Sequence, residues 1–283
     1  MCFIINKLRV KLVLLTFLLL SFCQVKAQKG KLFIIGGGSR SHELIQSLIK
    51  TADLAEKDYM IVLPMSSAEP EASYEAIKKQ LTAESKNNIG NLNFSTGNSH
   101  DKSWLDSLSK AKLIFITGGD QSRFMKVVLN TPIYSALHQA YQNGATVAGT
   151  SAGAAVMSKN MITGKQLLDT NYKETFDKLL ADNVEFEEGL GFLESVIIDQ
   201  HFLKRSRYNR LISALAAYPS YQCIGIDEGT AIIVHGKKIT VAGLSQVLQI
   251  SKPKKLKVNA KQLLSMDDLR FSLYVEGDQF SLK

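Results

Sequence analysis

Short apolar runs alternate with stretches of helical periodicity along the first half of the chain. Apolar residues at helical spacing follow the first run, at Leu44, Ile45, Leu48 and Ile49, and a second helix opens at Pro70. Most of the predicted strands are apolar on both faces, so we expect an α/β fold with a mostly parallel sheet flanked by helices. These strands are predicted at 32–35, 60–63, 113–116 and 145–148, with a weaker one at 92–94.

The second half of the chain adds one helix and several strands. Residues 204–217 predict the helix, with a core stripe of Tyr208, Leu211, Ile212 and Leu215. The last 25 residues predict an edge strand or a tail. No Pro- or Ser-rich linker interrupts the chain, so we expect a single domain, 28–283, with a core of about 30–250. The strands are predicted at 196–198, 224–226, 231–234 and 239–241, the last two as a hairpin.

Residues 1–27 predict a secretory signal peptide. Three basic residues precede an apolar run at 12–22 that is too short for a comfortable transmembrane span. Cleavage is expected after Ala27. The alternative is lipid attachment at Cys23, which the bulky Phe22 before it disfavours. We therefore expect export to the periplasm or the extracellular space, with no membrane span in the mature protein.

The charge and the cysteine content of the chain limit the classes of partner and ligand that we expect. The chain has 34 basic and 26 acidic side chains, and without the four basic residues of the leader the net charge falls from +8 to +4. This surplus is too small to indicate nucleic acid. Only Cys223 remains after the leader, and its apolar surroundings predict a buried side chain. No metal or cofactor is expected, because Gly36-Gly37-Gly38 lacks the dinucleotide pattern and no Cys/His spacing is typical of a metal site.

The sharpest motif is Gly149-Thr150-Ser151-Ala152-Gly153, which is G-x-S-x-G between a predicted strand and a helix-compatible stretch. A turn this tight exposes Ser151 as a nucleophile, and the helix start points the N–H of Ala152 at an oxyanion. The alternative is a glycine-rich turn whose serine only caps a helix. Thr117-Gly118-Gly119-Asp120-Gln121 ends the preceding strand, and its Gly119 is expected to provide a second oxyanion donor, although Gly-Gly-Asp also ends many strands without any function.

A serine nucleophile needs a base, and the chain contains five histidines. Only His201 ends a predicted strand, on the sheet edge where we expect Ser151. The alternative for a lone histidine is a structural role. For the acid that orients His201 we choose Glu228, at the next strand end, over Asp199 and Asp227.

Three arginines follow His201 at the start of the predicted helix. Arg205, Arg207 and Arg210 flank the core stripe of that helix without joining it. They predict either a solvated basic face or a cluster that binds carboxylates, for which guanidinium groups are well suited. The spacing leaves both interpretations open.

Together these motifs resemble the cyanophycinase family, serine exopeptidases grouped with aspartyl dipeptidase. The resemblance covers roughly Gly30 to Gln249. It rests on Gly149-Thr150-Ser151-Ala152-Gly153-Ala154, on Gly118-Gly119-Asp120-Gln121, and on Asp199-Gln200-His201-Phe202 with the three arginines. It implies a flavodoxin-like three-layer sandwich similar to class I glutamine amidotransferases. Its implied catalytic residues are Ser151, His201 and Glu228. Its implied substrate contacts are Gln121, Asp199, Gln200, Arg205, Arg207 and Arg210.

The resemblance predicts an exported exopeptidase that hydrolyses β-Asp-Arg-type bonds in a peptide or polymer of aspartate and arginine. The alternatives are an aspartyl dipeptidase-like hydrolase of another acidic peptide and a non-catalytic exported binding protein with the same cleft. A serine where amidotransferases have cysteine argues against glutamine hydrolysis. The segment Lys165–Glu188 does not map onto the family, and a homodimer is left open. A partner for a substrate guanidinium is expected among Asp182, Glu185, Glu187 and Glu188.

Overall fold

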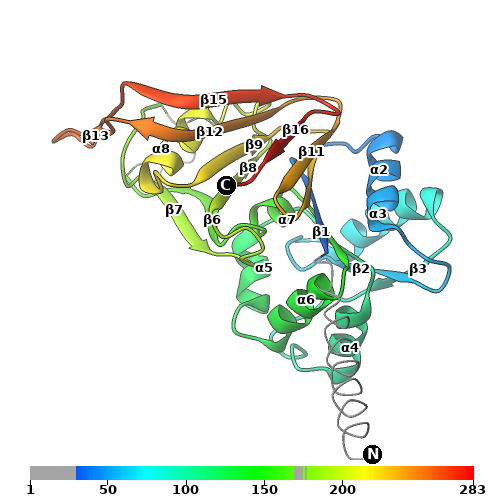
Figure 1. The fold of residues 1–283 in the computed structure, drawn as a ribbon. Helices are drawn as coiled ribbons and strands as arrows, with labels where there is room; N and C mark the ends of the chain where they lie inside the picture. The colour runs from blue at the N-terminus through cyan, green and yellow to red at the C-terminus, as the bar shows by residue number, and fades with distance from the viewer. Residues whose placement is uncertain (1–29, 169–174, 176) are drawn as a thin grey trace, which may run out of the picture.

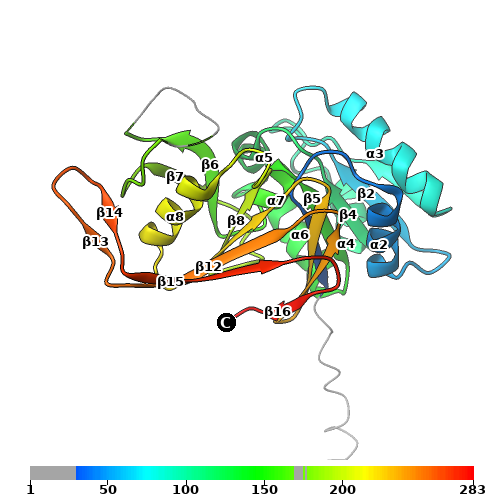
Figure 2. The ribbon, with the colours of Figure 1, turned by 90° about the horizontal axis from the view of Figure 1, so that it is seen from above.

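A computed structural model describes residues 30–168, 175 and 177–283. The predicted leader and Cys23 therefore lie outside the described residues. Figures 1 and 2 show two main sheets with helices packed against them and a narrow hairpin projecting from the body. Among the described helices, none has the length and apolar character needed to cross a bilayer.

The larger sheet has eight strands within the described residues, and its centre is parallel. The order is β16-β11-β10-β1-β5-β4-β2-β3, with parallel pairing from β1 to β3. This arrangement confirms the predicted α/β fold with a mostly parallel sheet. The parallel strands are β1 (Lys31–Ile35), β2 (Tyr59–Leu63), β3 (Asn88–Asn91), β4 (Leu113–Ile116) and β5 (Thr146–Thr150). The antiparallel strands are β10 (Thr230–His235), β11 (Lys238–Gly243) and β16 (Gln279–Ser281).

Helices cover both faces of this sheet because its strands are apolar on both sides. Leu32 and Ile34 of β1 face one core, whereas Phe33 and Ile35 face the other. The first core is closed by α4 (Lys102–Lys110), α5 (Gln121–Val128) and α6 (Pro132–Gln142). The second is closed by α2 (His42–Ala52) and α3 (Pro70–Glu84).

A four-stranded sheet carries the second half of the chain, in the order β15-β12-β9-β8. One face packs under α8 (Tyr208–Ala217), where Leu211 and Leu215 meet the buried Cys223. The opposite face, with Ile198 and Ile224, shares a core with the larger sheet. Its strands are β8 (Val196–Gln200), β9 (Gln222–Ile226), β12 (Val247–Lys254) and β15 (Asp268–Tyr274). Two hairpins complete the fold, β6 (Asn160–Gln166) with β7 (Val184–Glu188) and β13 (Lys257–Val258) with β14 (Leu264–Ser265).

Three local predictions are wrong. The third strand ends at Asn91, and the buried Leu92 and Phe94 follow it in a loop. Helix α8 begins four residues later than residue 204 because the preceding residues form turns, with a φ of 49° at His201. Tyr208 is exposed and does not belong to the core stripe of α8. The fully buried Phe202 contacts the Tyr208 ring edge-on. The predicted edge strand near the C-terminus is confirmed by β15 and β16.

Candidate active site

Ser151 lies in the turn between β5 and the short helix α7 (Ala152–Ala155). Its φ of 53° and ψ of −107° place a non-glycine residue in a sparsely populated conformation, and its N–H donates to Ile35 O at 3.1 Å. A Cβ on Gly149 would lie 2.1 Å from the carbonyl oxygen of Gly153, so only glycine allows strand and helix to approach this closely. Backbone geometry therefore presents the Ser151 side chain.

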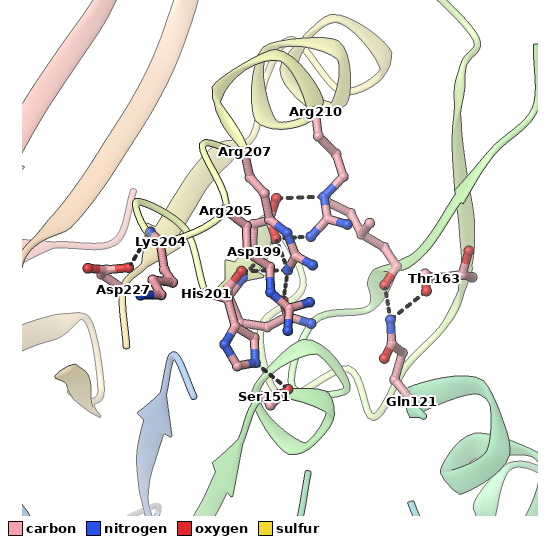
Figure 3. A network of polar contacts seen from close by, with 12 residues as sticks. Gln121, Ser151, Thr163, Asp199, His201, Lys204, Arg205, Arg207, Arg210 and Asp227 are labelled. Carbon is pink, nitrogen blue, oxygen red and sulfur yellow. Dashed lines mark hydrogen bonds and ion pairs between the residues drawn. The ribbon is translucent and has the colours of Figure 1, made fainter. Parts of the chain in front are cut away.

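His201 reaches Ser151 from the other sheet, at the end of β8. Its Nε2 lies 2.9 Å from Ser151 Oγ (Figure 3), and its N–H donates to Gly36 O at 2.7 Å. The prediction that the two residues share one sheet edge is wrong, because β5 belongs to the eight-stranded sheet and β8 to the four-stranded sheet. The ends of the two sheets meet because the chain crosses between them after β9.

Glu228 lies in that crossing between β9 and β10. Its Oε1 is 2.6 Å from His201 Nδ1, so one imidazole contacts both a hydroxyl and a carboxylate. Asp227 points elsewhere and accepts from the backbone N–H of Lys204 at 2.9 Å and from the hydroxyl of Ser245 at 2.7 Å. Of the three acids considered from the sequence, Glu228 is the one that the structure brings to His201.

A glycine loop packs against this pair, and sequence reasoning missed that role. Gly37 has a φ of +118°, and a Cβ there would lie 2.3 Å from Cε1 of the His201 ring. A Cβ on Gly38 would lie 2.7 Å from Cβ of Glu228. Any side chain at Gly37 would displace the imidazole. The signal in the sequence that could have indicated this role is the glycine run directly after β1, because β1 pairs with β5, the strand that leads to Ser151.

The surroundings of His201 favour its neutral form. Burial lowers the pKa of His201, because a charged imidazolium loses hydration. The hydrogen bond that His201 donates to Glu228 opposes that shift, while the charges of Arg205 and Arg207 lower the pKa further. A neutral imidazole at neutral pH is the form that accepts the Ser151 proton.

Ser151 and His201 open onto a cavity of about 430 Å³. Asp199 is absent from its lining. The lining contains Gly119, the oxyanion donor expected from the glycine motif. It also contains the other substrate contacts that the resemblance implies, which are Gln121, Gln200, Arg205, Arg207 and Arg210. The β6–β7 hairpin contributes Thr163, Gly164 and Lys165, none of which the sequence singled out individually.

The two residues expected to donate to an oxyanion are Ala152, which follows Ser151 in the chain, and Gly119, which lines the same cavity. Ala152 is the first residue of α7, so its N–H has no acceptor within the helix. Gly119 lines the cavity from the loop between β4 and α5, and the neighbouring Gly118 is close enough that a Cβ there would lie 3.9 Å from Ser151 Oγ. This arrangement is suited to an oxyanion.

Asp199 lies beneath the arginines, with a side chain that is 0% exposed. Arg210 donates to both of its carboxylate oxygens, including Nε to Oδ2 at 2.8 Å. Arg207 donates to the carbonyl oxygen and the side-chain oxygen of Gln200. Since Arg207 and Arg210 are buried, a solvated basic face is excluded for them, and Asp199 contacts arginines where a substrate contact was expected.

Gln121 fastens the β6–β7 hairpin to the site. Its buried amide donates to Ile162 O at 3.0 Å and to Thr163 O at 2.6 Å. The hydroxyl of Thr163 donates to Glu185 at 2.6 Å, and the same carboxylate lies 3.4 Å from Lys165 Nζ. The β6–β7 hairpin therefore forms a wall of the cavity, and Lys165 in that lining belongs to the segment that did not map onto the family.

A second cavity of about 710 Å³ adjoins the first and shares Asp120 and Ser122 with it. Glu187 and Glu188 line this second cavity. Of the four acids considered from the sequence as guanidinium partners, these two therefore lie near the site. Glu185 contacts Thr163 and Lys165 within the β6–β7 hairpin. Asp182 is exposed and lines neither cavity.

Comparison with known proteins shows the family and the fold that the chain shares with them. The model of peptidase family S51 matches residues 32–242. A cyanophycinase from Nostoc sp. (strain PCC 7120) is 33% identical over 274 residues, which cover 91% of this chain and 87% of the relative. A cyanophycinase from Synechococcus elongatus is 30% identical over 274 residues, 92% of this chain and 81% of the relative. The crystal structure of a peptidase from an acI-B1 Actinobacterium shares the fold, with a TM-score of 0.67 at 21% identity, over 91% of this chain and 98% of that one.

Proposed function

This chain belongs to peptidase family S51 and is a serine peptidase, and from that premise we propose that it cleaves with a Ser151–His201–Glu228 triad. One observation carries the proposal. Ser151 Oγ, His201 and Glu228 form a continuous series of contacts at 2.9 Å and 2.6 Å beside a cavity. A hydroxyl, an imidazole and a carboxylate in this order are the components of nucleophilic acyl transfer.

In the proposed reaction, Ser151 Oγ attacks the peptide carbonyl carbon while His201 Nε2 takes the hydroxyl proton. The N–H groups of Gly119 and Ala152 stabilise the oxyanion, and Glu228 stabilises the imidazolium. His201 then gives the proton to the leaving amine, which breaks the peptide bond and leaves an acyl-serine. A water molecule, deprotonated by His201, hydrolyses this ester and frees Ser151.

Covalent labelling with a fluorophosphonate tests the nucleophile. We expect labelling of the wild type, loss of labelling in Ser151→Ala, and normal labelling in Ser122→Ala. Ser122 is a matched control because it lines the same cavity. Labelling that persists in Ser151→Ala would move the nucleophile to another residue.

The substrate we propose is a peptide or polymer with β-Asp-Arg bonds, in which each arginine branch carries a free α-carboxylate. Three guanidinium groups at the cavity support an anionic group in the substrate. Arg205 and Arg207 are the groups assigned to the carboxylate, because both line the cavity and the charges of both act on His201 beside the nucleophile. The second cavity, with Glu187 and Glu188, is assigned to the guanidinium of the substrate.

Comparing β-Asp-Arg peptides with their arginine-amide analogues tests the carboxylate site. A charge-assisted hydrogen bond contributes roughly 1.5–3 kcal/mol, so Arg205→Ala should lower kcat/KM for the acid about 10- to 200-fold and leave the amide little changed. Lys204→Ala is the control, because Lys204 is an exposed cation in the same turn and lies outside the lining. Equal losses on both substrates would remove Arg205 from carboxylate recognition.

The guanidinium site is tested with β-Asp-citrulline, which has the same shape as β-Asp-Arg without its charge. Glu187→Gln and Glu188→Gln should each lower the ratio of kcat/KM for β-Asp-Arg to kcat/KM for β-Asp-citrulline. An unchanged preference would place the guanidinium elsewhere. Labelled enzyme that releases no β-Asp-Arg from cyanophycin would assign another acidic peptide as substrate.

Export is part of the proposal and rests on the N-terminal sequence alone. Mass spectrometry of the mature N-terminus distinguishes the two expected forms, Gln28 after signal cleavage and acylated Cys23 after lipid attachment. An intact Met1 terminus in the isolated protein would contradict export.

A further inference from the structure

Ser66 is a fully buried hydroxyl close to the candidate active site, and the proposed reaction gives it no role. It lies in the turn after β2, the strand that pairs with β4, so this turn lies beside the loop that follows β4. Its Oγ donates to Thr117 O at 2.6 Å and also lies 3.3 Å from Gly118 O. One side chain therefore contacts two successive carbonyl groups of the loop that leads to Gly119.

The main chain of Ser66 holds the same loop at its other end. The carbonyl oxygen of Ser66 accepts from the backbone N–H of Asp120 at 2.8 Å and from Nη1 of Arg123 at 3.1 Å. Gly119 has a φ of +139°, and a Cβ there would lie 2.1 Å from this carbonyl oxygen. The contact requires glycine, and the loop is fixed on both sides of Gly119 by a single residue.

These contacts set the direction of the Gly119 N–H. The peptide bond between Gly118 and Gly119 is trans, so its C=O and N–H groups point in opposite directions. Because Ser66 Oγ lies on the carbonyl side of this peptide, the N–H of Gly119 points away from Ser66. This N–H has no acceptor among the residues that the structure describes, and Gly119 lines the cavity together with Ser151. A fixed donor without a protein acceptor is available to a charge that develops in the cavity.

We propose that Ser66 is a positioning residue of the oxyanion site, which holds the Gly118–Gly119 peptide so that the Gly119 N–H faces the oxyanion formed at Ser151. This inference rests on the acyl transfer proposed above and adds the residue that orients one of its two donors. Ser66 acts only through Gly119 and contacts neither Ser151 nor His201. A preorganised donor stabilises charge that exists in the transition state and is absent from bound substrate. Ser66 should therefore affect kcat and leave KM nearly unchanged.

The rate of fluorophosphonate labelling tests the role without depending on the identity of the peptide substrate. Removing one oxyanion donor typically costs about 10²–10³ in rate, and Ser66→Ala only loosens such a donor, so we expect its second-order labelling rate constant to fall about 10- to 100-fold. Labelling should still reach completion, because the nucleophile is intact. Ser109→Ala is the matched control, since the buried hydroxyl of Ser109 also donates to a backbone carbonyl, that of Asp106 at 2.9 Å, and lines neither cavity of the site. The control should label at the wild-type rate.

Two further measurements separate positioning from a merely structural role. With a peptide substrate, Ser66→Ala should lower kcat with little change in KM, and the acidic limb of its pH profile should stay in place because the contacts of His201 are untouched. Ser66→Cys, which has nearly the same shape and a weaker donor, should show the same split to a smaller extent and provides the test if Ser66→Ala does not fold.

A Ser66→Ala variant that labels as fast as Ser109→Ala, or that raises KM while kcat is unchanged, would overturn the role of Ser66. Either result would leave the triad standing as long as Ser151→Ala is not labelled. Labelling of Ser151→Ala would instead remove the proposed reaction itself, and the role of Ser66 with it.

Discussion

The two sides of the candidate active site are built in opposite ways. On the side of the larger sheet, tight backbone turns and apolar contacts hold Ser151, with glycines where chain segments touch. On the side of the smaller sheet, buried ionic side chains surround His201, chiefly Asp199 with Arg210. The first side depends on local geometry, whereas the second depends on mutual neutralisation of buried charges. Substitutions should therefore affect the two sides differently.

The largest expected effect is on the nucleophile side. Ser151→Ala should lower kcat by about 10⁶ and leave the free energy of unfolding nearly unchanged, because the turn is fixed by its backbone. Steady-state kinetics and denaturant unfolding of the same preparation check both expectations. A variant that retains a tenth of wild-type activity would contradict the triad.

The contact between the two sides comes next. Glu228→Gln should lower kcat by roughly 10⁴, because the imidazolium loses its stabilising charge. Asp227→Asn is the matched comparison. Since Asp227 accepts from Lys204 and Ser245 and does not contact His201, we expect it to affect stability more than kcat. The reverse ranking in kcat would assign the acid to Asp227.

The ionic side should respond through stability. Asp199→Asn leaves Arg210 buried without its charge partner, which typically costs about 3–5 kcal/mol of the free energy of unfolding. Asp268→Asn is the control, because it breaks the exposed ion pair with Lys254 and should change stability very little. Denaturant unfolding of both variants measures the difference. Equal stabilities would show that Asp199 does not support the arginines.

The smallest expected effect is on the pH profile. Because burial lowers the pKa of His201 below its ordinary value of 6.5, kcat/KM should stay level from neutral pH to below 6.5 and then fall as the base is protonated. Arg205→Ala removes a positive charge that lowers this pKa, so the acidic limb should move to higher pH. Lys204→Ala should leave it in place. A limb that Arg205→Ala moves to lower pH would contradict this electrostatic assignment.

Much of the nucleophile side could be predicted from the sequence. The apolar runs predicted the central strands, and β4 spans the predicted residues. The G-x-S-x-G pattern predicted the turn at Ser151 because both of its requirements, small residues and a following helix, are local. The start of α8 could not be predicted in this way, since the turns at residues 201–207 depend on contacts with β9 and with the glycine loop.

The sequence by itself determined most of the central strands, the glycine turn and the choice of His201 among five histidines. Only the tertiary structure decided that Glu228 contacts His201, that Asp199 holds Arg210, and that Gln121 holds the β6–β7 hairpin. These partners lie 27, 11 and 41 residues apart, the last counted to Ile162. Periodicity reports how a segment buries its own side chains, but it carries no information on which distant polar group lies opposite. The polar partners are set when the two sheets pack together and bring the ends of β5 and β8 close to each other, because each buried charge must then have a partner.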